Sequence, residues 1–417
     1  MWLMLMNTSE KVPSSLFLSV IVVVLSFCGC NLVSSFTMTV QKNNNNNAHN
    51  SHDCERRKMT FQHPMSKNDE EVELRLGVLA DIQYAPVEDG FSYGGTPRYY
   101  RHALDATSEA CLEFRKGSSV VDAILNLGDS LDGKCIDHDS MECLQRVLST
   151  LSSANSPIYH TYGNHEMYNI DRSTLLSQII PTTTTATPEE VEEDVGYYTI
   201  MLNQDWRLIV MDTYDISLFH SKKKHLADEI LTKHNPNYPE KENSPEGLKG
   251  KSRRFVAFGG GVDEPQIQWL TNLLQQSRAN KQKVLLMSHQ PLHPNSSPPV
   301  CLVWNYPQIL ELLEEYSDVV AMHLSGHAHM GGYFRSEKGI HYRVMEAVLE
   351  SPPPISTFGI LNITQSNLHL QGYGDCKSGT YSLDHLSSTA DDDNNKVIQE
   401  VDCDELFNNT AVSVITS

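Results

Sequence analysis

Side chains that bind metal ions follow several short apolar segments of this sequence. The positions concerned are Asp81, Gln83, Asp129, Asn164, His289, His327 and His329. Carboxylate and amide oxygens and imidazole nitrogens are the ligands that proteins use for divalent cations. Taken alone, each residue has an ordinary structural reading, because Asp and Asn are common turn residues and a lone His is usually hydrogen-bonded or on the surface. The whole set falls at corresponding points of successive segments, however, and it therefore predicts a metal centre.

Two neighbouring divalent cations require a bridging carboxylate and a mixture of oxygen and nitrogen donors. Asp129, at the end of the segment NLGD (126–129), is the natural bridge. His327 and His329 are separated by one residue, so they point to opposite sides in an extended chain, whereas a turn lets both face the cations. A pair of such cations lowers the pKa of a shared water to roughly 7 and holds the nucleophile beside the atom that it attacks. The set thus predicts a site for two divalent metal ions.

The body of the chain alternates between short apolar segments and segments of helical spacing. We expect strands at residues 73–80, 123–127, 157–162, 196–202, 206–212, 284–288 and 319–325, helices at residues 98–115, 141–151, 265–277 and 306–313, and hairpin-like pieces at residues 331–336 and 341–348. Apolar strands that alternate with helices indicate an α/β protein with mostly covered sheets. The metal-binding residues follow predicted strands, and the carboxyl ends of strands are where open α/β sheets bind ligands.

Composition and charge exclude several classes of protein. A hydrophobic content of 40% in 417 residues is enough for a sizeable core. A formal net charge of −20 argues against a nucleic-acid partner, because phosphate backbones are bound through clustered Lys and Arg. The nine cysteines form no CxxC pair, which disfavours a disulfide scaffold and a zinc ribbon. Cys135 and Cys143 could pair in an oxidising compartment.

The first 70 residues differ in character from the rest. Residues 16–27 are a 12-residue apolar run, the length of the hydrophobic part of a signal peptide, and extension to residue 36 reaches the length of a signal anchor. Residues 34–36 also resemble the junction of bipartite plastid-targeting leaders. We therefore expect residues 1–36 to be a signal-peptide-like or signal-anchor leader. It would direct the chain to the secretory pathway or a plastid, or hold it in a membrane if it is not cleaved.

Other polar stretches predict linkers, loops and a tail. Residues 37–70 contain the Asn run 43–47 and predict a disordered linker. Residues 376–417 include a run of Asp and Asn at 391–395 and predict a flexible acidic tail. Within the body, residues 181–193 and 215–250 are polar and are expected to be surface loops.

The motifs together resemble those of one enzyme superfamily. In chain order they are ADIQYA (80–85), NLGDSLDG (126–133), YGNHE (162–166), SHQPLHP (288–294) and GHAHMGGY (326–333). They resemble the calcineurin-like metallophosphoesterases and, within them, the manganese-dependent ADP-ribose/CDP-alcohol diphosphatases, over residues 72–374. Segments FGGGVDEPQIQWL (258–270) and WNYPQIL (304–310) also fit this subfamily. The resemblance implies an αββα sandwich with two mixed sheets, formed by residues 71–375.

The same resemblance implies two metal sites that share Asp129. The remaining ligands form two groups: Asp81, Gln83 and His329, and Asn164, His289 and His327. Most of the superfamily has His where this chain has Gln83. An amide in place of an imidazole makes the first site richer in oxygen, which favours Mn²⁺, with Mg²⁺, Zn²⁺ or Fe²⁺ as alternatives.

His165, directly after Asn164, is the candidate catalytic residue. It could donate a proton to the leaving oxygen or stabilise its charge, and a carboxylate such as Asp129, Asp132 or Glu166 would orient it. Tyr93, Arg98 and Arg101 follow the first motif and are candidates for contacts with an anionic substrate.

We expect the substrate to be a small nucleoside diphosphate derivative, such as ADP-ribose or a CDP-alcohol. Its pyrophosphate bond would be cleaved by a metal-activated hydroxide. The alternative is a phosphodiesterase or phosphomonoesterase of the same fold. A non-catalytic scaffold is disfavoured, because degenerate members lose metal ligands or the histidine of the GNH motif, and this chain retains both.

Overall fold

The computed structural model describes residues 70–117, 120–180 and 194–386. The predicted leader and the predicted linker up to residue 69 lie outside the described residues, so these assignments stay predictions. Within the described ranges, no helix combines the length and the hydropathy that crossing a membrane requires.

Two six-stranded sheets form the centre of the described region. The first has the order β14-β13-β12-β1-β4-β5, which are Gly379–Ser382, Asn367–Tyr373, Phe358–Ile363, Leu74–Leu79, Ala123–Asn126 and Ile158–His160. The second has the order β10-β11-β9-β8-β7-β6, which are Met330–Arg335, His341–Glu346, Val320–Ser325, Lys283–Ser288, Trp206–Val210 and Tyr198–Met201. Strands β1, β4 and β5 are parallel, as are β7, β8, β9 and β11, and the other pairings are antiparallel. Both sheets are therefore mixed.

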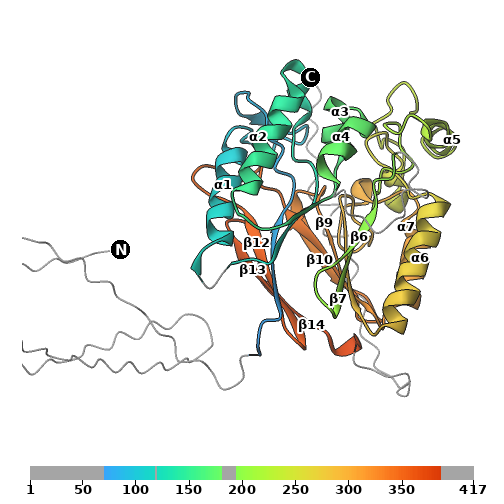
Figure 1. The fold of residues 1–417 in the computed structure, drawn as a ribbon. Helices are drawn as coiled ribbons and strands as arrows, with labels where there is room; N and C mark the ends of the chain where they lie inside the picture. The colour runs from blue at the N-terminus through green and yellow to red at the C-terminus, as the bar shows by residue number, and fades with distance from the viewer. Residues whose placement is uncertain (1–69, 118–119, 181–193, 387–417) are drawn as a thin grey trace, which may run out of the picture. The chain divides into compact units, whose positions relative to one another are not determined.

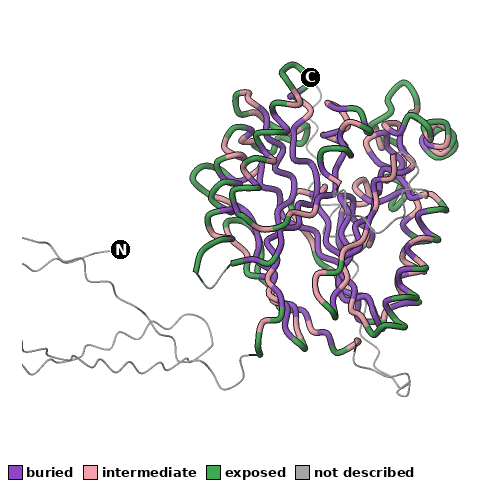
Figure 2. Tube along the Cα trace, in the orientation of Figure 1, coloured by how far each residue is buried: buried purple, intermediate pink, exposed green. Residues whose placement is uncertain are grey.

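Helices cover the outer faces of the two sheets, as Figure 1 shows. Helices α1 (His102–Phe114) and α2 (Ser140–Ser152) pack on the first sheet, and α6 (Glu264–Ala279) and α7 (Tyr306–Glu315) pack on the second. One apolar core lies between the sheets and one lies between each sheet and its helices. In Figure 2 the buried residues, coloured purple, lie mainly in the interior of the folded region. The expected αββα sandwich with two mixed sheets is confirmed.

The sequence of β1 explains how one strand serves two cores. Leu74, Leu76 and Val78 alternate along the strand and lie in the core between the sheets, as the two-residue period of a strand requires. Gly77 faces the other way, where a Cβ would lie 2.8 Å from the ring of Phe114. The glycine therefore lets α1 pack closely on the sheet.

Several elements were not predicted from the sequence. They are β2 (Gly90–Phe91), β3 (Pro97–Arg98), α3 (Asn164–Asn169), α4 (Arg172–Ile179), α5 (Lys224–His234), β12, β13, β14, and the 3₁₀ helices η2 (Gly133–Asp137), η3 (Gly250–Arg254), η4 (Pro299–Cys301) and η5 (Asp384–Leu386). The prediction that residues 215–250 are a loop was wrong where α5 lies. Ala227 and Leu231, one helical turn apart, are buried with Phe255 and Trp304 in a small separate core.

The first sheet extends beyond residue 375, where the acidic tail was expected to begin. Residues 376–386 include β14, which pairs with β13, and the 3₁₀ turn η5. Tyr381 and Leu383 are buried in the core between the sheets, so this part of the predicted tail belongs to the fold. Residues 387–417 lie outside the described residues.

Replacing Tyr381 by Ala should lower the free energy of unfolding by about 3 kcal/mol, because a large buried ring is removed from the core between the sheets. Denaturant unfolding of the full chain measures the change. The neighbouring Thr380 is exposed on the same strand, so Thr380→Ala should change stability by less than about 0.5 kcal/mol. Equal effects of the two substitutions would contradict the placement of β14 in the sheet.

Candidate metal centre

The seven predicted ligands converge at one edge of the two sheets. Asp81 and Gln83 follow β1, Asp129 follows β4, and Asn164 opens the helix after β5. His289 directly follows β8, His327 follows β9, and His329 directly precedes β10. Because β1, β4 and β5 are parallel, as are β8 and β9, their carboxyl ends bring these loops together.

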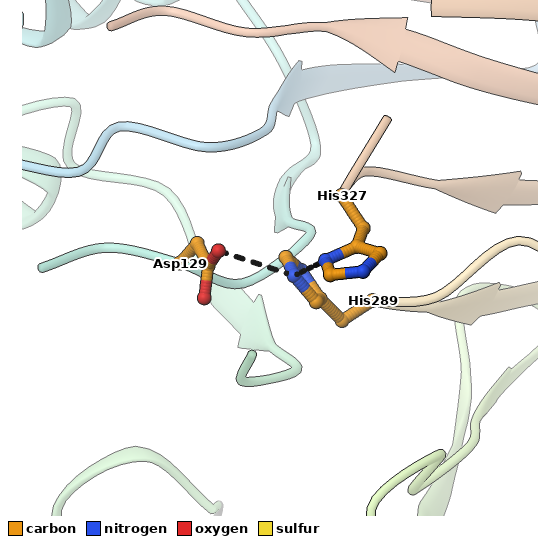
Figure 3. A group of neighbouring side chains, drawn as sticks. All are labelled: Asp129, His289 and His327. Atoms are coloured by element: carbon orange, nitrogen blue, oxygen red, sulfur yellow. Dashed lines mark hydrogen bonds and ion pairs between the residues drawn. The ribbon is translucent and has the colours of Figure 1, made fainter. Parts of the chain in front are cut away.

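Asp129, His289 and His327 form one cluster (Figure 3). One ligand atom from each lies within 4.8 Å of the others. Nε2 of His289 is 3.3 Å from Oδ2 of Asp129 and 3.1 Å from Nδ1 of His327. Nδ1 of His289 donates to the carbonyl oxygen of Leu127 at 2.8 Å, because a carbonyl can only accept. Nε2 therefore faces the cluster, which is the orientation a metal ligand needs.

Asp81, Gln83 and His329 form a second group next to Asp129. Nε2 of His329 lies 3.4 Å from Oδ1 of Asp81 and 3.0 Å from the amide nitrogen of Gln83. The amide nitrogen also donates to Oδ2 of Asp129 at 3.0 Å. The amide oxygen of Gln83 is buried and has no hydrogen-bond partner in the described part of the chain. A half-turn of the amide exchanges these two atoms, so Gln83 can present an oxygen to the group.

Asn164 is held in place by two tyrosines. Its amide oxygen accepts from the hydroxyl of Tyr214 at 3.0 Å, and its amide nitrogen donates to the hydroxyl of Tyr168 at 3.0 Å. Sequence reasoning did not assign a role to either tyrosine. Tyr214 lies between the expected strand at residues 206–212 and the expected loop at residues 215–250, and its distance in sequence from Asn164 matches no motif.

Four of the predicted ligands have a left-handed backbone conformation. The φ angles are 52° at Asp81, 44° at Gln83, 53° at Asp129 and 66° at His327. This conformation costs an L-residue roughly 1–2 kcal/mol, so surrounding contacts must hold it. The N–H of Gln83 donates to the carbonyl of Asp129 at 2.8 Å, and the N–H of His327 donates to the carboxylate of Asp81 at 3.0 Å. The loops thus hold one another in place.

The buried charges of the centre stabilise positive charge. Burial alone would raise the pKa of Asp129, but the charge of His289 holds it well below its usual range. Burial alone would lower the pKa of His289, but Asp129 raises it to about 9. Burial alone would also lower the pKa of His329, but Asp81 helps to raise it to about 10. A bound cation can take the place of the protons on these imidazoles.

His165 lies beside Asp132 at the rim of the centre. Its Nδ1 accepts from the N–H of Gly133 at 3.0 Å and lies 3.3 Å from Oδ2 of Asp132. Arg98 approaches the same carboxylate oxygen, with Nη1 3.5 Å from Oδ2. Burial alone would raise the pKa of Asp132, but the neighbouring side chains of His165 and Arg98 hold it below its usual value. Of the three carboxylates proposed to orient this ring, Asp132 is the one beside it.

Glu166 and Asp129, which were also expected to orient the ring of His165, contact backbone groups instead. Asp129 accepts from the backbone N–H of His165 at 2.9 Å, so it holds the main chain and not the ring. The buried carboxylate of Glu166 accepts from the backbone N–H groups of Asp129, Ser130 and Gly163. Glu166 thus fixes the two loops that follow β4 and β5 to each other.

Arg98 is the one of the three predicted substrate contacts that the structure places beside the other site residues. Arg101 forms an exposed ion pair with Glu88 at 2.6 Å, and the side chain of Tyr93 is fully exposed. The roles proposed for Tyr93 and Arg101 stay predictions.

Glu350 is a residue of this centre that the sequence did not reveal. Its Oε1 lies 2.7 Å from Nδ1 of His329, so this imidazole donates to the carboxylate and turns Nε2 toward Asp81. A carboxylate behind a metal-bound His is a common arrangement that orients the ring and makes it a stronger ligand. Glu350 lies 21 residues after His329 in the loop that follows β11, and no motif spacing indicates it.

The donor set fits two divalent cations. One small region receives a buried amide oxygen of Gln83 without a hydrogen-bond partner in the described residues, the inward-facing Nε2 atoms of His289 and His329, and the carboxylates of Asp81 and Asp129. Asp129 contacts members of both groups, through His289 and through Gln83. A shared carboxylate between two groups of donors is the arrangement that a two-metal site requires.

The chain belongs to the calcineurin-like phosphoesterase family, whose sequence profile matches residues 74–331. The family identified from the motifs is thereby confirmed. It makes the chain a member of a family of metal-dependent phosphohydrolases.

Relatives within the family carry a more specific name. Two of them, from Oryza sativa subsp. japonica and Homo sapiens, are named manganese-dependent ADP-ribose/CDP-alcohol diphosphatase. The rice protein is 38% identical over 302 residues, which cover 71% of this chain and 90% of its own length. The human protein is 35% identical over 311 residues, covering 72% and 90%. The solved structure of a dimetal phosphatase from Danio rerio is similar with a TM-score of 0.69 and 31% identity, over 75% of this chain and 99% of that one.

Replacing Glu350 by Ala should weaken Mn²⁺ binding roughly 10- to 100-fold, because His329 loses the carboxylate that orients it. Glu350→Gln keeps an acceptor oxygen and should fall between Ala and the wild type. The affinity is measured by titrating the metal-free chain with Mn²⁺ and monitoring the electron paramagnetic resonance signal of the free ion. Glu337→Ala, which removes an exposed carboxylate in the turn between β10 and β11, is the control. Unchanged affinity in Glu350→Ala would refute the role assigned to this residue.

Proposed function

We propose that this chain hydrolyses the pyrophosphate bond of nucleoside diphosphate derivatives of the ADP-ribose and CDP-alcohol class, with two Mn²⁺ ions as cofactors. The observation that carries the proposal is the convergence of two groups of oxygen and nitrogen donors on the shared carboxylate of Asp129. The name that the similar proteins share supports the substrate class, and the alignments cover about nine tenths of those proteins.

The ligand assignment follows the two groups. Asp81, Gln83 and His329 would hold one ion, Asn164, His289 and His327 the other, and Asp129 would bridge both. When bound, the ions supply positive charge to the phosphoryl oxygens and lower the pKa of a water molecule to roughly 7. Amide oxygens from Gln83 and Asn164 and carboxylate oxygens from Asp81 and Asp129 make the donor set hard. Hard donors favour Mn²⁺ or Mg²⁺ over Zn²⁺.

The residues of the chain position the substrate and handle the leaving group. His165 is assigned as the group that donates a proton to the leaving oxygen. Nδ1 of His165 accepts from Gly133, so the proton of the neutral ring is on Nε2, the nitrogen with no hydrogen-bond partner among the described residues. Asp132 lies beside the ring and stabilises it when it is positively charged. Arg98, at the same carboxylate, is placed to attract an anionic substrate.

The substrate class is tested by assaying the full chain with Mn²⁺ against ADP-ribose, a CDP-alcohol, a cyclic nucleotide and p-nitrophenyl phosphate. The two pyrophosphate compounds should be cleaved with kcat/KM higher by about tenfold or more. Each should yield a nucleoside monophosphate, identified by chromatography. Preference for the cyclic nucleotide would favour a phosphodiesterase, and preference for the nitrophenyl ester a phosphomonoesterase. Either result would refute the proposed substrate class.

Replacing His165 by Ala should lower kcat on ADP-ribose roughly 10²- to 10⁴-fold, the range for loss of a general acid, with metal content unchanged. The loss should be smaller on a nitrophenyl ester, because that leaving group needs no proton. Ser177→Ala, at an exposed position of the neighbouring helix α4, is the control and should leave kcat unchanged. Equal impairment of His165→Ala on both kinds of leaving group would contradict proton donation.

A further inference from the structure

A pocket opens to solvent between α5, the end of η3 and the start of α7. It has a volume of about 370 Å³, within the range of small-molecule sites. The residues that line it include Ile230, His234, Arg254, Phe255, Trp304 and Pro307. We call it the α5–α7 pocket. None of its residues is a predicted metal ligand, and its elements lie at one side of the molecule in Figure 1.

Arg254 supplies a fixed positive charge to this pocket. Its Nε donates to the carbonyl of Trp304 and its Nη1 to the carbonyl of Lys251, both at 2.6 Å. The guanidinium lies 4.2 Å from the ring centre of Phe255 and 5.2 Å from that of Tyr306. Within the described residues no carboxylate pairs with it and its Nη2 has no partner. A rigid guanidinium with an open nitrogen is suited to bind a phosphate or carboxylate.

The surroundings of the pocket are basic although the chain is acidic. Lys249, Lys251 and Arg253 lie next to Arg254 and are exposed. None of these three has an ion-pair partner among the residues that the structure describes. Uncompensated cations in a chain of net charge −20 create a local field that attracts anions. The ligand of this pocket is therefore expected to carry negative charge.

The walls of the pocket are apolar and aromatic. Ile230, Trp304 and Pro307 supply apolar surface, and the rings of His234 and Phe255 stack at 4.4 Å. The indole nitrogen of Trp304 is buried against Gly259, so Trp304 contributes ring surface to the pocket and not a hydrogen bond. Apolar walls with a fixed cation suit a ligand that combines a flat ring and an anionic group.

We propose that the α5–α7 pocket is an accessory binding site for a nucleoside monophosphate, with the phosphate on Arg254 and the base against the apolar walls. Hydrolysis of the pyrophosphate bond of a nucleoside diphosphate derivative releases such a molecule, so the choice of ligand rests in part on the proposed function. The pocket would then bind a product of the centre.

One short segment joins the pocket to the centre. Phe255 lines the pocket, and Phe258, three residues later, has its ring 5.8 Å from the ring of His327. The N–H of Trp304 donates to the carbonyl of Gly260 at 2.8 Å, and a Cβ at Gly259 would lie 2.7 Å from the indole nitrogen. The indole therefore lies directly against the segment that contacts the metal centre.

Calorimetric titration of the Mn²⁺-loaded full chain with AMP and with CMP tests the inference without using turnover. The wild type should bind two equivalents, one at the metal centre and one at the pocket. Arg254→Gln should lose the second equivalent or weaken it roughly 10- to 100-fold, the scale of a charge-assisted hydrogen bond. Arg253→Gln, a neighbouring exposed arginine on η3, is the matched control and should keep both. Ile230→Trp, which fills the pocket from α5, should also lose the second equivalent.

The outcomes separate this inference from the proposed function. One equivalent in the wild type, or two in both Arg254→Gln and Ile230→Trp, would overturn the accessory site. Inorganic phosphate that binds the pocket as tightly as AMP would overturn the assignment of a nucleotide. A chain that binds AMP at Arg254 but does not cleave ADP-ribose would refute the proposed function alone.

Discussion

The burial of several carboxylates in one small region is the constraint on which the rest of the structure depends. An ionised carboxylate in the protein interior is strongly unfavourable unless hydrogen bonds or opposite charge compensate it. Here the main chain provides many of the bonds. The N–H of His327 donates to Asp81, that of His165 donates to Asp129, and three N–H groups donate to Glu166. These bonds require the loops to turn sharply, and the left-handed residues among the metal ligands are the result. Imidazoles from the second sheet supply the compensating positive charge.

The two sheets set the distances within which this compensation works. Each sheet contributes loops from the carboxyl ends of parallel strands, and the loops approach so closely that two positions must be glycine. A side chain at Gly163 would overlap the carboxylate of Asp129, and one at Gly326 would overlap that of Asp81. The glycines of the GNHE and GHAH motifs are therefore explained by space and not by backbone flexibility. The positions of these two carboxylates therefore depend on how closely the loops of the two sheets pack.

The sequence predicted the strands that end in metal ligands well, because a short apolar run followed by Asp, Asn or His is a local pattern. The αββα architecture came from the family resemblance and not from periodicity. Strands β12 to β14 were missed individually, since their segments carry no site residue that marks a strand end. Helix α5 was missed because only Ala227 and Leu231 are buried in a polar sequence. Glu350 and Tyr214 reach the site from loops that only the folded chain brings near, and local patterns cannot indicate such contacts.

The pairing of β1 has a consequence for the order in which the chain can be assembled. Leu74, near the start of the described residues, lies opposite Ile363, near their end, and strands with such distant partners form slowly because a very long loop must close first. During synthesis from the ribosome, β1 can meet β4 early but cannot meet β12 until nearly the whole domain has emerged. Until then one edge of β1 has unpaired backbone groups, and exposed strand edges promote aggregation. A nascent chain of this topology therefore depends on shielding of that edge, by chaperones or by rapid completion, before its metal centre is complete.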